Sequence, residues 1–243
     1  MAIRKKRERW SQKKMEIARR VANWLRFIPT IKMVAVTGAL AMNNSQKEDD
    51  IDLLIVTTKN RLWLTRLLTV FLAELVARRR RPGDSEVRDK ICLNMFLDEN
   101  HLAVPKKEQD LFSAHEVCQL KLLWEKDETY QRFLRSNQWV ERYLPNWKEN
   151  TSEANTPIPD RAKAYAKNDP GLKDTSDGDP KGLLRGGAMD KLEILAMRLQ
   201  LVYMARRKTT ETTEPGRIRF HPEDARKWIL KKYQKRLQKL HLA

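Results

Sequence analysis

The stretch VAVTGALAMNNSQKEDDIDLLIVT, residues 34–57, decides the fold of this chain. It completes an apolar, β-branched run over residues 31–37, turns at Gly38, crosses a polar loop and enters a second apolar run over residues 51–57. Short apolar runs that are bounded by turn residues are typical of buried strands. The stretch therefore predicts two strands of one sheet, connected through a turn and a polar loop.

Two carboxylates, Asp50 and Asp52, stand at the start of the second run. Side chains alternate along a strand, so both project from one face while Ile51 points to the other. Two carboxylates held side by side repel one another, and a hard divalent cation such as Mg²⁺ (or Mn²⁺) relieves that repulsion. The alternative is that the two acids simply begin a strand at the surface. Gly38 favours the metal site, because a surface strand start would not require a glycine upstream.

The turn at Gly38 supplies a second element of the predicted site. A glycine lets the backbone approach a ligand closely, and exposed N–H groups in such a turn can cradle a phosphate. Together, the turn and the acids predict that the phosphates of a nucleoside triphosphate lie over a metal held by Asp50 and Asp52. ATP is the expected nucleotide.

This arrangement resembles the nucleotidyltransferases of the DNA polymerase β superfamily, which carry a Gly-Ser turn after the first strand and an Asp-x-Asp pair on the next. Here Gly38-Ala39 and Asp50-Ile51-Asp52 fall at the spacing of the small bacterial members. The resemblance covers residues 33–97.

The resemblance implies an α/β (α+β) fold, with a small mixed sheet flanked by helices and a mainly helical C-terminal region. It also implies transfer of a nucleoside monophosphate from an NTP to an acceptor hydroxyl, with release of pyrophosphate. Asp50 and Asp52 would be the metal ligands, and the backbone of Gly38 and Ala39 would bind the phosphates.

Two positions depart from the family pattern. Ala39 stands where the family has Ser, and the third carboxylate that the family carries on the following strand, residues 90–97, is replaced at mid-strand by Asn94. Asp89 and Asp98 are the alternatives for that third acid. Two hypotheses therefore stay open: an active nucleotidyltransferase, and a degenerate member that binds nucleotide without turnover.

Two arginines follow the strand that bears the acids. Arg61 and Arg66 lie in the first turns of a predicted helix over residues 61–78, from which either could reach a triphosphate. The alternative is a solvated helix face or a partner for Glu74. The arginine run at residues 78–81 is interpreted as a charge cluster at the end of this helix.

The whole chain divides into five predicted segments. They are a basic N-terminal helix (1–30), a nucleotidyltransferase core (31–105), a helical region packed on the core (106–147), a flexible linker or insertion (148–187) and a helical, basic C-terminal region (188–243).

The formal net charge of +17 belongs to the two ends of the chain. Residues 1–27 hold ten Lys and Arg against two Glu, and residues 217–243 hold nine against one Glu and one Asp. Such helices can bind RNA or another nucleic acid through its phosphates without reading sequence. A basic nucleic-acid-binding protein on the same fold is therefore a further alternative, beside charge that serves solubility or an acidic partner.

Nothing in the sequence indicates a membrane span. The most apolar run, residues 62–77, carries two charged residues and falls short of the roughly 20 residues that a spanning helix needs. No secretory signal pattern is present, and the two cysteines lack the CxxC spacing of a zinc or redox site. The sequence thus predicts a cytoplasmic protein with reduced thiols and no membrane partner.

Overall fold

The two strands predicted from residues 34–57 lie at the centre of a mixed α/β structure. The computed structural model describes residues 2–147, 187–205, 212–214, 216–219 and 225–240. In this part of the chain the strands are β1 (Ile31–Val36), β2 (Ile51–Thr57), β3 (Ile91–Asp98), β4 (Lys121–Glu125), β5 (Thr212–Glu214) and β6 (Arg217–Arg219). The α-helices are α1 (Ala2–Leu25), α2 (Gly38–Ala41), α3 (Leu62–Val76), α4 (Leu111–Gln119), α5 (Thr129–Ser136), α9 (Ala188–Ala205) and α10 (Ala225–Lys239), and two 3₁₀ turns cover Lys106–Glu108 and Gln138–Arg142.

The strands form one six-stranded sheet within the described residues, in the order β4-β1-β2-β3-β6-β5. β1 is antiparallel to both β2 and β4, and β6 is antiparallel to both β3 and β5. β2 and β3 are parallel, and α3 makes the crossover that parallel neighbours require. The predicted α/β class, with a mixed sheet flanked by helices and a helical C-terminal region, is confirmed.

One prediction for the helical region is wrong. Residues 106–147 are predicted to be helical, but α4 ends at Gln119 and the chain then forms β4. The physical reason is tertiary: without β4, β1 would have an open edge, and Trp124 and Leu122 pair there with Val34 and Ala35. The Asp110 carboxylate caps α4 by accepting from the Ser113 N–H at 2.8 Å.

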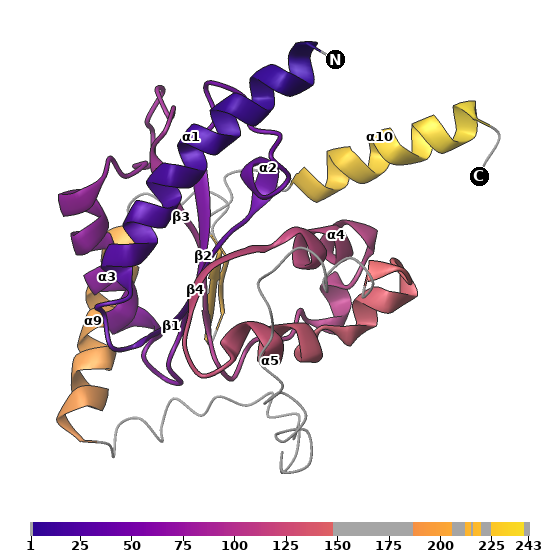
Figure 1. Cartoon of the computed structure of the whole chain (residues 1–243). Helices are drawn as coiled ribbons and strands as arrows, with labels where there is room; N and C mark the ends of the chain where they lie inside the picture. The colour runs from indigo at the N-terminus through magenta and orange to yellow at the C-terminus, as the bar shows by residue number, and fades with distance from the viewer. Residues whose placement is uncertain (1, 148–186, 206–211, 215, 220–224, 241–243) are drawn as a thin grey trace.

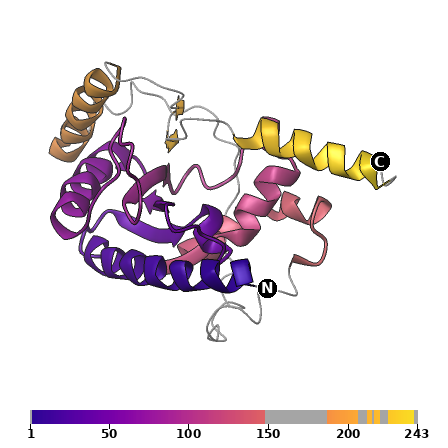
Figure 2. The same cartoon turned by 90° about the horizontal axis from the view of Figure 1, so that it is seen from above.

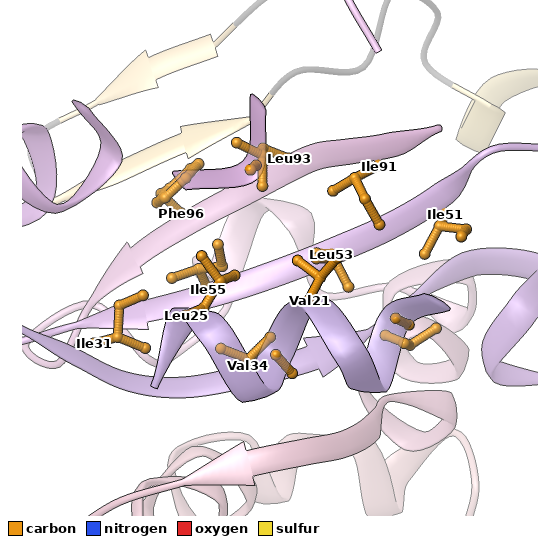
Figure 3. Packing of buried hydrophobic residues seen from close by; sticks show 14 of the residues in the cluster. Val21, Leu25, Ile31, Val34, Ile51, Leu53, Ile55, Ile91, Leu93 and Phe96 are labelled. Carbon is orange, nitrogen blue, oxygen red and sulfur yellow. The ribbon is translucent and has the colours of Figure 1, made fainter. Parts of the chain in front are cut away.

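Helices cover both faces of the sheet. Figure 1 shows α3 and α9 on one side and α4 and α5 on the other. Seen from above in Figure 2, α9 and α10 lie at opposite ends of the molecule. The first face packs against α1, α3 and α9 through a large buried cluster, part of which Figure 3 shows: Val21, Leu25, Ile31, Val34, Ile51, Leu53, Ile55, Ile91, Leu93 and Phe96.

The second face packs against α4 and α5 through a smaller cluster. Its strand residues are Met33, Ala35, Leu54, Val56 and Leu97, and its helical residues include Ala114, Val117, Tyr130 and Phe133. Ile51, Leu53 and Ile55 point to the first face and Leu54 and Val56 to the second, as the period of a strand requires.

Helix α3 is less buried than its apolar sequence predicts. Phe71 and Leu75 are 65% and 66% exposed, because α3 packs its inner side on the sheet and one flank on α9. Nothing in the described part of the chain covers its outer side. A helix in a single covering layer buries only the stripe that faces its neighbours, whatever the composition of the rest.

In the ranges that the structure describes, no helix is both long enough and apolar enough to cross a membrane. The predicted linker or insertion, residues 148–187, lies outside the described residues except for Gly187. The division of the chain into five segments stays a prediction.

Candidate metal and nucleotide site

The glycine turn after β1 lies directly against one of the predicted metal ligands. Gly38 has a φ of +63°, and a Cβ built on it would stand 3.0 Å from Oδ2 of Asp52. The preceding N–H, that of Thr37, donates to the Asp52 carbonyl at 3.1 Å. Position 38 therefore requires glycine for two reasons: the left-handed backbone and the close approach of a carboxylate.

Asp50, Asp52 and Cys92 form the one group of potential metal-binding side chains found in the described residues. Their ligand atoms all lie within 4.8 Å of one another. Asp52 and Cys92 are paired across the parallel strands β2 and β3, and the Cys92 thiol donates a hydrogen bond to the Asp52 carboxylate. The structure thus brings the two predicted acids together and adds a thiol that the sequence did not single out.

The predicted third position lies at the site beside a second residue of β3. Asn94 is buried on β3 and lines the same cavity as Asp52, while Cys92 is the residue paired with Asp52. The register shifts directly after this pair: Asp52 pairs with Cys92, whereas Leu54 pairs with Met95, so β3 carries an extra residue between these pairs.

The two alternatives for the third acid lie elsewhere. Asp89 accepts from Lys14 Nζ at 2.7 Å, and Asp98 contacts His101 Nδ1 at 2.6 Å at the other end of β3. Each carboxylate has a structural partner of its own, and neither belongs to the group formed by Asp50 and Asp52.

Burial and charge both act on the Asp52 carboxylate. Burial, followed by the neighbouring charge of Asp50, raises its pKa to about 7, against the opposing effects of the Cys92 hydrogen bond and the Arg80 charge. Burial, then the charge of Asp52, also raises the pKa of the Cys92 thiol well above its usual range. The thiol is therefore the donor and the Asp52 carboxylate the acceptor in the hydrogen bond between them.

A loop arginine that the sequence assigned to a helix end reaches the site. Arg80 Nη1 lies 2.7 Å from Asp50 Oδ2. The arginine is held there because its N–H donates to the Ile91 carbonyl at 2.8 Å, which ties the segment after α3 to the start of β3. No local sequence signal distinguishes Arg80 from its neighbours in the run 78–81, since the contact depends on this long-range pairing.

Helix α1 holds the loop that carries the acids. Lys14, only 1% exposed, donates from Nζ to the carbonyls of Lys47 and Asp49 at 3.2 and 2.6 Å and to the Asp89 carboxylate at 2.7 Å. A buried ammonium with three acceptors is fully satisfied, and it fixes the backbone one residue before Asp50. The N-terminal helix therefore has a structural role at the site beyond its basic surface.

A cavity of about 540 Å³ opens beside Asp52 on the second face of the sheet. Its polar lining includes Thr37, Gly38, Asn94 and Glu116, and its walls are the apolar side chains of β2, β3 and α4. The Thr37 hydroxyl is buried and has no hydrogen-bond partner among the described residues. In the same described ranges the N–H groups of Gly38 and Ala39 donate to no acceptor. Three donors are thus available at this edge of the cavity.

The structure does not bring the two predicted phosphate-binding arginines of α3 to this site. Arg61 Nη2 contacts Asp190 Oδ1 at 2.6 Å, and Arg66 donates to the Gln200 side chain, both on α9. Both arginines follow the C-terminal end of β2, whereas Asp50 and Asp52 lie at its beginning. The length of one strand separates them from the acids.

The two basic ends of the chain are placed differently. α1 buries one side on the sheet, while the described side chains of α10 are mainly exposed and the helix contacts α4 (Figure 1). Binding of nucleic acid through these helices stays a prediction.

Comparison with known proteins places the chain in no family. The sequence matches no protein-family model and no curated protein. Among solved structures, it is similar to a crystal structure of a toxin–antitoxin with AMP-PNP, at 14% identity over 61% of this chain and 94% of that chain, with a TM-score of 0.29. A likeness this slight carries no argument about the fold or the function.

Proposed function

We propose that this protein is a metal-dependent nucleotidyltransferase that transfers a nucleoside monophosphate from an NTP, with ATP as the expected donor, to an acceptor hydroxyl. The observation that carries the proposal is the pair Asp50 and Asp52: their ligand atoms lie within 4.8 Å of one another, and Asp52 lies against the Gly38 turn and lines a cavity. Such a pair is suited to a divalent cation, which would offset the charge of bound phosphates.

The donor set fits Mg²⁺ or Mn²⁺. The carboxylates of Asp50 and Asp52 offer the oxygen ligands that hard cations prefer, and such cations keep open positions for water and phosphate. The Cys92 thiol donates a hydrogen bond to Asp52, so it would support that carboxylate beside the cation. When bound, the cation would offset charge on the transferred phosphate.

The chain's own donors support binding of the triphosphate. The Thr37 hydroxyl and the N–H groups of Gly38 and Ala39 line the cavity edge beside Asp52. The hydroxyl of Thr37 would take the place of the serine that the family has at position 39. Arg80, which forms an ion pair with Asp50, would lie beside the phosphates. It would supply the positive charge that was expected from Arg61 and Arg66.

A second candidate is nucleotide binding without turnover. Two observations favour it: the cavity position where the third acid was expected carries the amide of Asn94, and Arg80 forms an ion pair with Asp50. The two candidates share the same binding site and differ only in release of pyrophosphate.

The test is a titration of ATP with and without Mg²⁺, followed by a pyrophosphate-release assay with water, small hydroxyl compounds and total RNA as acceptors. Asp52→Asn is expected to abolish Mg²⁺-dependent binding and to lower turnover by more than about 1,000-fold while the melting temperature is kept. Asp127→Asn, which changes an exposed acid paired with Lys32, is the matched control and should behave as the wild type. Unchanged ATP binding by Asp52→Asn would refute the metal site, and binding without pyrophosphate release would select the second candidate.

A further inference from the structure

One carboxylate faces the proposed site from a helix rather than from the sheet. Glu116 lies in the middle of α4, which covers the second face of the sheet and contacts α2. Its side chain is half-buried and lines the cavity together with Thr37, Asp52 and Asn94. Its charge is close enough to contribute to the raised pKa of Asp52. Glu116 on α4 and Asp52 on β2 therefore line one cavity from different elements.

The Glu116 carboxylate forms no hydrogen bond or ion pair with any described residue, and burial alone raises its pKa. Other buried carboxylates are satisfied. Glu108, on the same cavity, contacts Arg217 at 3.0 Å and Arg219 at 2.9 Å, and Glu193 accepts from two backbone N–H groups at the start of α3. Because the Glu116 side chain lines the cavity and has no partner among the described residues, its carboxylate is available to a ligand bound there.

The proposed reaction lacks a proton acceptor within the sheet. Asp50 and Asp52 would be engaged with the cation, the Cys92 thiol is occupied by its hydrogen bond to Asp52, and the amide of Asn94 is not a base at neutral pH. The acceptor hydroxyl must nevertheless lose its proton when it attacks. The chain therefore needs a base that reaches the cavity from another element.

We propose that Glu116 is the general base that takes the proton of the acceptor hydroxyl. This inference rests on the proposed nucleotidyl transfer. The acceptor O–H bond breaks and its proton moves to the Glu116 carboxylate, while the acceptor oxygen forms a bond to the α-phosphorus. The bond between that phosphorus and the pyrophosphate oxygen breaks, and its electron pair leaves with pyrophosphate. Glu116 then returns the proton to solvent, and the acceptor is held between Asp52 and α4.

The test compares ATP binding and pyrophosphate release in full-length wild-type protein, Glu116→Gln and the control His115→Gln, which changes the exposed neighbouring residue on α4. The affinity of Glu116→Gln for ATP and Mg²⁺ should lie within about threefold of the wild-type affinity. Its rate of pyrophosphate release should be lower by a factor of about 100 or more. Because the substitution removes an unpaired, partly buried charge, its melting temperature should equal or exceed that of the wild type. His115→Gln should match the wild type in all three measurements.

A second variant separates a base from a structural residue. Glu116→Ala leaves room beside α4, and added formate should restore pyrophosphate release in a saturable manner, with no effect on the wild type. Turnover of Glu116→Gln within about threefold of the wild type, or a loss of its ATP binding, would overturn the role of Glu116 and leave the proposed function standing. Wild-type protein that binds ATP but releases no pyrophosphate with any acceptor would overturn the transfer reaction and this base together.

Discussion

The two faces of the sheet differ in how completely helices cover them. On the first face, α1, α3 and α9 bury a continuous apolar cluster that includes Leu25, Leu53 and Phe96. On the second face, α4 and α5 cover less of the sheet and leave the cavity beside Asp52. A tightly packed face contributes most of the hydrophobic stabilisation, whereas an incompletely covered one leaves room for polar side chains and a ligand. Strand alternation sorts the residues: Ile51 points to the first face, and Asp52 lines the cavity on the second.

The hollows on the two faces also differ in charge. On the first face, an open groove between α1 and the end of α3 is lined mainly by basic side chains, among them Lys13, Arg20 and Arg78, beside the acids Glu86 and Asp89. The cavity on the second face has Asp52 and Glu116 on its walls. The arrangement of acids, glycine turn and unpaired donors selects the second.

The largest expected effect on stability concerns Lys14, through which α1 on the first face holds the loop before Asp50. Lys14→Met removes an ammonium with three acceptors and leaves Asp89 with a partly buried, weakly compensated charge. We expect a loss of about 3 kcal/mol in the free energy of unfolding, measured by denaturant titration. The exposed neighbour Lys13→Met should change it by less than about 0.5 kcal/mol. Equal effects of the two substitutions would show that α1 does not anchor the loop before Asp50.

The next effect separates backbone strain from contact with the acid. Gly38 and Gly83 both have a positive φ, of +63° and +86°. A Cβ at position 38 would lie 3.0 Å from the Asp52 carboxylate, whereas a Cβ at position 83 would have no atom within 4 Å. Gly38→Ala and Gly83→Ala should both lose about 1–2 kcal/mol of stability through the backbone alone. Only Gly38→Ala should also lose Mg²⁺-dependent ATP binding, measured by calorimetry. Normal ATP binding by Gly38→Ala would contradict the proposed approach of the phosphates to this turn.

The smallest effect concerns the ion pair at the rim of the cavity. Arg80→Gln removes the ion-pair partner of Asp50, so Mn²⁺ alone should bind about tenfold more tightly. ATP with metal should bind about tenfold more weakly, because the variant lacks the guanidinium that would contact the phosphates. Both affinities can be measured by electron paramagnetic resonance and calorimetry. Arg79→Gln, whose guanidinium contacts Glu74, is the control and should change neither. If both affinities rose together in Arg80→Gln, Arg80 would be a competitor of the cation only.

Local physics made part of this site predictable. The apolar runs of β1 and β2, the projection of Asp50 and Asp52 from one face and the need for glycine at position 38 all follow from strand period and backbone sterics, which depend on neighbours in sequence. Asn94 lines the cavity beside Asp52, but the cross-strand pairing of Asp52 with Cys92 depends on the register between β2 and β3, which the sequence does not fix.

The sequence by itself determined the α/β class, the two central strands and the paired acids with their glycine turn. Only the tertiary structure decided which other charges join them: Arg80 through its pairing with Ile91, Glu116 through the packing of α4, and Lys14 through the docking of α1. The tertiary structure also pairs Arg61 and Arg66 with residues of α9, Asp190 and Gln200. The physical reason is that alternation and φ preferences act between adjacent residues, while register, helix docking and ion pairing are settled between segments far apart in the chain.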